Sequence, residues 1–200
     1  MKVGVFALQG DFSKHKESLL SLSTKILEVR TAHELDAVDA LIIPGGESST
    51  FLKLLTSNFK SLLIKRAKEG MPILATCAGL ILIAKKVHNP EQESLGLLNV
   101  EVERNAYGRQ LDSFIEPKLQ LSDIGYKELE KKEIKFKRNF EAVFIRAPEI
   151  IKVNKEVKVL ATHKNNPVLV MENNIIAASF HPELSNEKDD SIYKLFLSNI

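Results

Sequence analysis

Short apolar runs in the first part of the chain alternate with longer stretches of mixed polarity, and this alternation restricts the fold more than any other feature of the sequence. Each run has the length of a β-strand, and the stretches between them have the apolar spacing of helices. Repeated strand–helix units favour a parallel sheet, because parallel strands need crossover helices to connect them. We therefore predict a three-layer α/β fold whose mostly parallel central sheet is flanked by helices, with early strands at Val3–Leu8, Thr24–Val29, Ala40–Ile43 and Pro72–Thr76.

The second half of the chain is richer in strand-like segments. We expect these strands at Val100–Arg104, Ala142–Ile145, Val157–His163, Val168–Glu172 and Ile175–Ser179, followed by a last helix near Ser191–Ser198. No repeat, linker or low-complexity tract divides the 200 residues, of which 44% are apolar, so we expect a single domain over residues 1–200.

Local signals mark some helix ends. Thr31-Ala-His-Glu34 has the spacing of a capping box, in which the threonine and the glutamate satisfy each other's backbone N–H groups. Gly70 followed by Pro72 ends the helix expected over Lys60–Glu69.

The only cysteine, Cys77, lies where one apolar run ends and another begins after Ala78-Gly79. This pattern predicts a strand, a tight turn and a helix, with the thiol at the carboxyl end of the strand. The first amides of the following helix would favour a thiolate there. A buried structural cysteine is the alternative, because unpaired cysteines often behave as small hydrophobes.

A histidine and a carboxylate far downstream favour the catalytic interpretation of Cys77. His181 and Glu183 flank Pro182 just after the apolar run that begins at Ile175. In extended backbone, residues two apart project to the same side, so the carboxylate can hold one imidazole nitrogen while the other faces the thiol. A nucleophilic cysteine needs such a base and such an orienting group.

A double glycine follows the run Ala40–Ile43 and precedes hydroxyl residues suited to capping a helix. Gly45 and Gly46 can present backbone N–H groups to a ligand, as an oxyanion hole requires. A plain strand-to-helix turn is one alternative. A phosphate cradle is another, but there is no GxxxxGK[ST] sequence and Glu47 would repel an anion.

Taken together, these motifs resemble a known family. Pro44-Gly-Gly-Glu-Ser-Ser, Ala75-Thr-Cys-Ala-Gly and His181-Pro-Glu are similar to the signature of class I, triad-type glutamine amidotransferases, whose sheet is flavodoxin-like. Further segments resemble, more narrowly, the family of glutaminase subunits of pyridoxal 5'-phosphate synthase: Ala7-Leu-Gln-Gly-Asp, the stretch from Leu95 to Gln110, and Val143-Phe-Ile-Arg-Ala-Pro.

The resemblance implies an activity and the residues that carry it. The chain would hydrolyse L-glutamine to L-glutamate and ammonia with the catalytic residues Cys77, His181 and Glu183, and backbone N–H groups at Gly45, Gly46 and Ala78 would hold the oxyanion. Carried over position by position, the glutamine site would comprise Gly46, Glu47, Ser48, Arg104, Ile145 and Arg146, with Gln9 and Asn105 as weaker candidates.

Some of these assignments also have a physical reason. The α-carboxylate of glutamine suits an arginine, and its α-ammonium group needs oxygen acceptors. Taken without the family, Arg104 and Arg146 are better explained as structural salt bridges or surface charges. We interpret the histidines outside the triad as surface residues: His15, His33, His88 and His163.

The family also implies a partner. Ammonia would pass to a (β/α) barrel synthase subunit within a ring-shaped hetero-oligomer, and docking of that partner would reorganise the loop at Gly45–Gly46. No cofactor or metal is expected in this chain. The alternatives are a glutaminase subunit of another amidotransferase, a γ-glutamyl hydrolase and, more remotely, a binding module without turnover.

Charge and composition restrict the remaining possibilities. The net charge of +2 argues against a nucleic-acid partner. The charged stretch from Lys127 to Arg138 reads as solvated surface. We interpret Gly125–Arg138 as a lengthened surface loop, with an altered docking of the partner as the alternative. A single cysteine, no cleavable signal pattern and no apolar run of membrane-spanning length predict a cytoplasmic protein without membrane contact.

Overall fold

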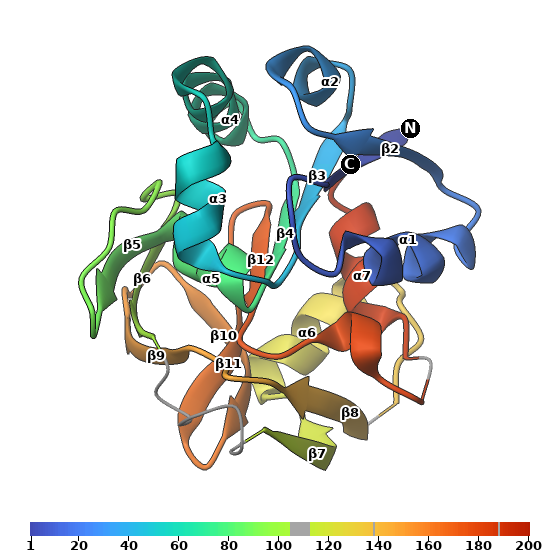
Figure 1. Cartoon of the computed structure of the whole chain (residues 1–200). Helices are drawn as coiled ribbons and strands as arrows, with labels where there is room; N and C mark the ends of the chain where they lie inside the picture. Colours follow the sequence, from blue (N-terminus) through green and yellow to red (C-terminus); the bar gives the residue numbers. More distant parts are fainter. Residues whose placement is uncertain (105–112, 138, 188) are drawn as a thin grey trace.

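Strands from both ends of the sequence form one seven-stranded sheet at the centre of the protein (Figure 1). The computed structural model describes residues 1–104, 113–137, 139–187 and 189–200. In the sheet, β2, β1, β3, β4 and β12 pair in parallel, and β11 and β10 extend it in antiparallel pairing. In sheet order, the strands are β10 (Lys158–His163), β11 (Asn166–Glu172), β12 (Ile175–Ala178), β4 (Ile73–Thr76), β3 (Ala40–Ile43), β1 (Lys2–Phe6) and β2 (Lys25–Val29).

Two apolar cores, one on each face, bury this sheet. Ile43 and Ala75 belong to one core, whereas their chain neighbours Ile42 and Leu74 belong to the other, because successive side chains of a strand point to opposite faces. Strands β3, β4 and β12 are buried along their whole length, as expected for parallel strands covered on both sides.

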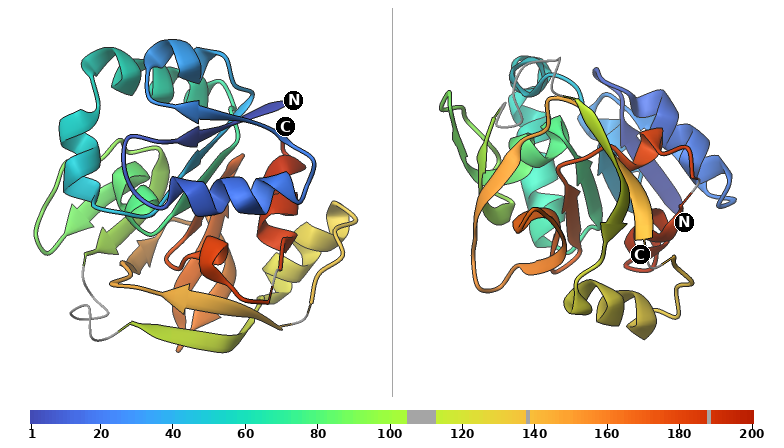
Figure 2. Two further views of the ribbon diagram at one scale, coloured as in Figure 1. Left: turned by 45° about the vertical axis from the view of Figure 1, so that its right-hand side comes forward. Right: turned by 90° about the horizontal axis from the view of Figure 1, so that it is seen from below.

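Helices cover the two faces and make the outer layers. On one side lie α2 (Ala32–Asp36), α3 (Ser48–Leu54), α4 (Ser57–Lys68) and α5 (Ala78–Ile83). On the other side lie α1 (Phe12–Leu20), α6 (Asp123–Lys131) and α7 (Ser191–Leu197). Figure 2 shows this arrangement from two further directions, with the chain termini near one another. The predicted three-layer fold with a mostly parallel sheet is confirmed.

Two smaller sheets complete the structure. One contains β5 (Ala84–His88), β6 (Leu98–Glu103) and β9 (Glu149–Val153), and the other pairs β7 (Phe114–Gln120) with β8 (Asn139–Phe144). A 3₁₀ turn, η2 (Pro182–Leu184), follows β12. The strand prediction missed β5, β7 and β9, which contain several charged or polar residues that weaken the strand pattern.

The capping box is confirmed. The Thr31 side chain accepts a hydrogen bond from the backbone N–H of Glu34, whose carboxylate accepts one in return from the N–H of Thr31. The next predicted helix, Lys60–Glu69, begins earlier, at Ser57, where the Thr56 side chain caps it.

The expected surface loop over Gly125–Arg138 is wrong for its first part. Helix α6 begins at Asp123, and the Ser122 side chain caps it by accepting a hydrogen bond from the N–H of Gly125. A Cβ at Gly125 would lie 2.3 Å from the carbonyl oxygen of Leu160, so the helix packs directly on β10. Glu128 and Leu129 are buried, so the segment after Lys127 is not all solvated surface, and Arg138 lies outside the described residues. Among the helices of the described residues, none is long and apolar enough to cross a membrane.

Candidate active site

The turn predicted at Cys77 is present. Cys77 is the single residue between β4 and α5, and its backbone has φ 49° and ψ −105°, a region that side-chain-bearing residues rarely adopt. Gly79 makes the turn sterically feasible, because a Cβ there would lie 2.2 Å from the carbonyl oxygen of Ile43. The thiol is 6% exposed and its Sγ lies 3.8 Å from the carbonyl oxygen of Ile145.

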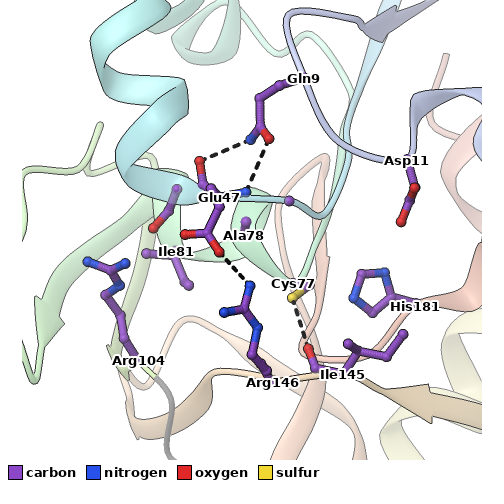
Figure 3. Close-up of a pocket in the computed structure, with 12 residues that line it drawn as sticks. Gln9, Asp11, Glu47, Cys77, Ala78, Ile81, Arg104, Ile145, Arg146 and His181 are labelled. Carbon is purple, nitrogen blue, oxygen red and sulfur yellow. Dashed lines mark hydrogen bonds and ion pairs between the residues drawn. The ribbon is translucent and has the colours of Figure 1, made fainter. Parts of the chain in front are cut away.

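His181 reaches the same edge of the sheet because β12 pairs in parallel with β4, with Ala178 opposite Thr76. Cys77 follows β4 directly and His181 follows β12 by a few residues. The backbone N–H of His181 also donates to the carbonyl oxygen of Val143 at 2.8 Å, which ties the turn to β8. Figure 3 shows the imidazole beside the sulfur of Cys77.

The carboxylate of Glu183 contacts the imidazole of His181 at Nδ1. The Nδ1 atom of His181 lies 2.7 Å from Oε1 of Glu183, and both side chains are buried. The predicted pair is therefore present, but the extended backbone assumed for it is not. His181 precedes the 3₁₀ turn η2, and the turn curls the carboxylate back onto the ring.

The charges of this pair reinforce each other. Burial lowers the pKa of His181, but hydrogen bonds to Cys77 and Glu183 outweigh it and raise the pKa to about 10. Burial raises the pKa of the Glu183 carboxyl, but electrostatic attraction to His15 and the hydrogen bond to His181 outweigh it and lower the pKa. The site therefore favours an imidazolium beside an ionised carboxylate.

The glycine loop fits closely around the histidine. A Cβ at Gly45 would lie 2.4 Å from Cε1 of His181, so only glycine fits at this position. Gly46 has φ +142°, and a Cβ there would lie 2.8 Å from the amide of Gln9. That amide forms two hydrogen bonds with Glu47, donating to its carbonyl oxygen at 3.0 Å and accepting from its N–H at 3.3 Å.

Cys77, His181 and Gly46 line a cavity of about 230 Å³, whose small size suits a ligand the size of an amino acid. The cavity brings together every glutamine-site residue predicted from the sequence within the described part of the chain. Asn105 lies outside the described residues. The lining comprises Gln9, Asp11, Gly46, Glu47, Ser48, Cys77, Ala78, Ile81, Arg104, Ile145, Arg146 and His181.

Asp11 and Ile81 were not predicted from the sequence. Asp11 ends the motif Ala7–Asp11 and could have been found there. Ile81 lies four residues after Cys77, one turn along α5, so helical spacing would have placed it beside the thiol. Gly45 and Glu183 are not among the residues that line the cavity: Gly45 packs against Cε1 of His181, and Glu183 contacts Nδ1 of the same ring.

Charged and polar side chains stand across the cavity from the thiol. Arg146 forms an ion pair with Glu47, and both side chains are about half exposed. The Ser48 hydroxyl donates to Oε1 of Gln92 at 3.0 Å. Arg104 lies on the opposite side of the cavity from His181 (Figure 3). Its backbone N–H donates to the carbonyl oxygen of His88. Arg146 is thus both a salt-bridge partner and a residue that lines the cavity.

The interpretation of the remaining histidines as surface residues is wrong for two of them. His15 is 0% exposed, and its ring contacts Tyr193, Thr76 and Glu183. His163 is 8% exposed and packs against the rings of Phe114 and Phe144.

The other two histidines are more accessible. His33 is exposed as predicted, and His88 is half-buried beside Glu101. Within residues 1–104, 113–137, 139–187 and 189–200, no group of three or more His, Cys, Asp or Glu side chains is arranged to hold a metal ion.

The parallel sheet with a cysteine at a strand–turn–helix junction is the fold of class I glutamine amidotransferases. A sequence profile of the SNO glutamine amidotransferase family matches residues 5–200, and the chain belongs to this family. It is similar over its full length to proteins named pyridoxal 5'-phosphate synthase subunit PdxT, with 45% identity to the one from Thermosipho africanus (99% of that chain covered) and 44% to the one from Thermotoga petrophila (100% covered). A crystal structure described as a glutamine amidotransferase superposes with a TM-score of 0.85 at 42% identity, covering 98% of this chain and 97% of that one.

Proposed function

We propose that this chain is the glutaminase subunit of a pyridoxal 5'-phosphate synthase, and that it hydrolyses L-glutamine to L-glutamate and ammonia. The observation that carries the proposal is that Cys77 and His181 line one cavity while the Glu183 carboxylate lies 2.7 Å from the imidazole of His181. Membership of an amidotransferase family and full-length similarity to subunits of that synthase support it. Residues 1–200 would form one glutaminase domain, because the central sheet joins strands from both ends of the chain.

The first half-reaction acylates the cysteine. The thiolate of Cys77 attacks the side-chain amide carbon of glutamine, and a carbon–sulfur bond forms as the carbonyl π electrons move to oxygen. The imidazolium of His181 then gives its proton to the amide nitrogen, the carbon–nitrogen bond breaks, and ammonia leaves. The product is a γ-glutamyl thioester on Cys77. Glu183 keeps the ring oriented and stabilises its positive charge.

The second half-reaction releases glutamate. The neutral imidazole of His181 takes a proton from water, whose oxygen attacks the thioester carbon, and the carbon–sulfur bond breaks to restore the thiolate. Backbone N–H groups of Ala78 and of the Gly45–Gly46 loop would hold the oxyanion in both steps. Ala78 is the first residue of α5, where backbone N–H groups have no partner within the helix.

Substrate recognition follows from the charges that line the cavity. Arg146 and Arg104 would take the α-carboxylate of glutamine, and the carboxylate of Glu47 would take the α-ammonium group. Glu47 and Arg146 neutralise each other as an ion pair, so a zwitterion can replace each partner of the pair without a net change of charge. Ser48, Ile145 and Gly46 complete the walls.

Ammonia would pass to a separate synthase subunit. We expect that partner to be a (β/α) barrel that assembles into a ring, and its docking to adjust the Gly45–Gly46 loop. A reducing compartment such as the cytoplasm suits a catalytic thiol that must stay unoxidised.

The experiment is glutamate release from L-glutamine by the purified chain, alone and with a pyridoxal 5'-phosphate synthase barrel subunit. Cys77→Ala and Cys77→Ser test the nucleophile, and His33→Ala serves as a control at an exposed histidine. We expect release that rises with the partner and disappears in both Cys77 variants.

Each other outcome has its own meaning. Release that depends on Cys77 but ignores the partner would support a glutaminase and reject the synthase assignment. Release that persists in the Cys77 variants, or that never occurs, would reject the triad chemistry.

A further inference from the structure

A third ionisable side chain lies behind the catalytic pair. Glu183 has two carboxylate oxygens, and only Oε1 faces His181. Its Oε2 is buried and has no hydrogen bond within the described part of the chain, but Nε2 of His15 lies 3.4 Å away at ion-pair distance. Both side chains are 0% exposed. The outer oxygen of the carboxylate therefore faces the ring of a residue on α1.

The surroundings of His15 define which of its nitrogens carries the proton. Nδ1 lies 2.9 Å from the hydroxyl of Tyr193, and Nε2 lies 3.2 Å from Oγ1 of Thr76. A neutral imidazole has one N–H donor. If Nδ1 carried the proton, the bare Nε2 could accept from the Thr76 hydroxyl, but Oε2 of Glu183 would then face a second acceptor and stay buried without a donor, at a cost. The favoured tautomer therefore has Nε2–H toward Glu183, with Nδ1 accepting from Tyr193.

The charge states of these groups agree with that assignment. Burial lowers the pKa of His15, while the negative charge of Glu183 acts in the opposite direction and His181 and Asp11 contribute less. Burial also raises the pKa of Tyr193, so its hydroxyl keeps the proton that it donates. The ring is neutral near pH 7 and retains a single donor.

We propose that His15 is a positioning residue for glutamine hydrolysis, whose Nε2–H holds Oε2 of Glu183 so that Oε1 stays on Nδ1 of His181. The inference rests on the triad proposed above. It extends the polar chain from the cavity through His181, Glu183 and His15 to Tyr193, and links the orientation of the base to helices α1 and α7. His15 does not touch the substrate cavity, so its effect is on the turnover rate rather than on glutamine binding.

The test uses the complex with the synthase subunit. His15→Leu removes both ring nitrogens, whereas His15→Gln keeps an amide donor near the position of Nε2. Tyr193→Phe removes only the hydroxyl that sets the tautomer, and His33→Ala is the matched control at an exposed histidine. The readouts are kcat and KM for glutamine, the pH profile of kcat, and the thermal midpoint of each variant.

We expect His15→Leu to lower kcat about tenfold, the effect of losing one hydrogen bond to a charged group, with KM within about twofold of the parent. The acid limb of the pH profile of kcat for His15→Leu should move to higher pH, because Glu183 is protonated more readily without the N–H donor of His15. His15→Gln should recover most of kcat and the original limb. Tyr193→Phe should lower kcat about threefold while the protein stays folded.

Several results would overturn the proposal. Equal losses in His15→Leu and His15→Gln, with the parent pH profile, would show a packing role only. Parent activity in His15→Leu would remove any role. If His15→Leu does not fold, the other two variants decide. Parent kinetics in both His15→Gln and Tyr193→Phe would fit a packing role for His15 and would contradict a tautomer set by Tyr193. Glutamate release by Cys77→Ala would instead reject the triad itself, which separates the two failures.

Discussion

Gly45 lies directly against the imidazole of His181, and a Cβ at this position would be 2.4 Å from Cε1 of the ring. The Gly45–Gly46 loop therefore limits the positions that the imidazole of His181 can adopt. We expect Gly45→Ala to displace the ring from Glu183 and Cys77 and to lower kcat by about a hundredfold or more.

Gly96→Ala is the control for this substitution, because a Cβ there meets nothing within 4 Å and the cost is only that of a positive φ, about 1 kcal/mol of stability. Steady-state glutamate release and urea unfolding of both variants check the prediction. Normal turnover by Gly45→Ala would contradict the contact.

The raised pKa of His181, to about 10, predicts how Cys77 reacts with alkylating agents. An imidazolium that persists through neutral pH attracts the negative charge of the attacking sulfur, so iodoacetamide should modify Cys77 faster at pH 7 in the parent than in His181→Asn. Mass spectrometry at Cys77 measures both rates, and glutamine should protect the parent. Equal rates in the parent and in His181→Asn would contradict the pairing of the thiol with the imidazolium.

The lowered pKa of Glu183 predicts a loss of stability in acid. A carboxyl whose pKa falls on folding contributes stability that is complete above its unfolded pKa of 4.5 and is lost as pH falls through the folded value. The thermal midpoint of the parent should therefore fall below about pH 4.5 more steeply than that of Glu183→Gln, which should be less stable at pH 7. Glu91→Gln, at an exposed glutamate, should follow the parent curve. Parallel curves for the parent and Glu183→Gln would refute the assignment.

The ion pair between Glu47 and Arg146 predicts a binding defect without a large stability defect. Both side chains are about half exposed, so the pair contributes less than about 1 kcal/mol to folding. Arg146→Ala and Glu47→Gln should raise KM for glutamine about tenfold or more, because each removes a charge that matches the substrate. Arg30→Ala, which breaks an exposed pair with Glu28, is the control and should leave KM unchanged. Parent KM values in both site variants would remove them from the glutamine site.

The contact between α6 and β10 predicts an effect that a surface loop would not show. A Cβ at Gly125 would lie 2.3 Å from the carbonyl oxygen of Leu160, so Gly125→Ala should cost about 1–3 kcal/mol of unfolding free energy. Ser122→Ala should cost about 1 kcal/mol through loss of the helix cap. Urea titrations measure both, with glutamate release expected to stay near the parent level. An unchanged free energy of unfolding in Gly125→Ala would favour the loop interpretation.

The three-layer fold and most of the site could be predicted because their signals are local or ordered along the chain. The run Pro72–Thr76 and the turn at Ala78-Gly79 place Cys77 without reference to distant residues. Strands β5, β7 and β9 could not be predicted in this way, because their polar residues hide the apolar pattern. Helix α6 was missed because its charged outer face masks the few residues that pack on β10.

By itself, the sequence determined the order along the chain of most sheet-forming segments, the strand–turn–helix junction that carries Cys77, and the pairing of His181 with Glu183 two residues away. All of these features depend on neighbouring residues. Only the tertiary structure decided which distant side chains meet: Gly45 against His181, Arg146 with Glu47, and His15 behind Glu183. Strand pairing and helix packing bring these residues together, and such contacts leave no periodic pattern along the chain. His15, in a polar segment, carries no mark of its burial until α1 packs against the turn at Glu183.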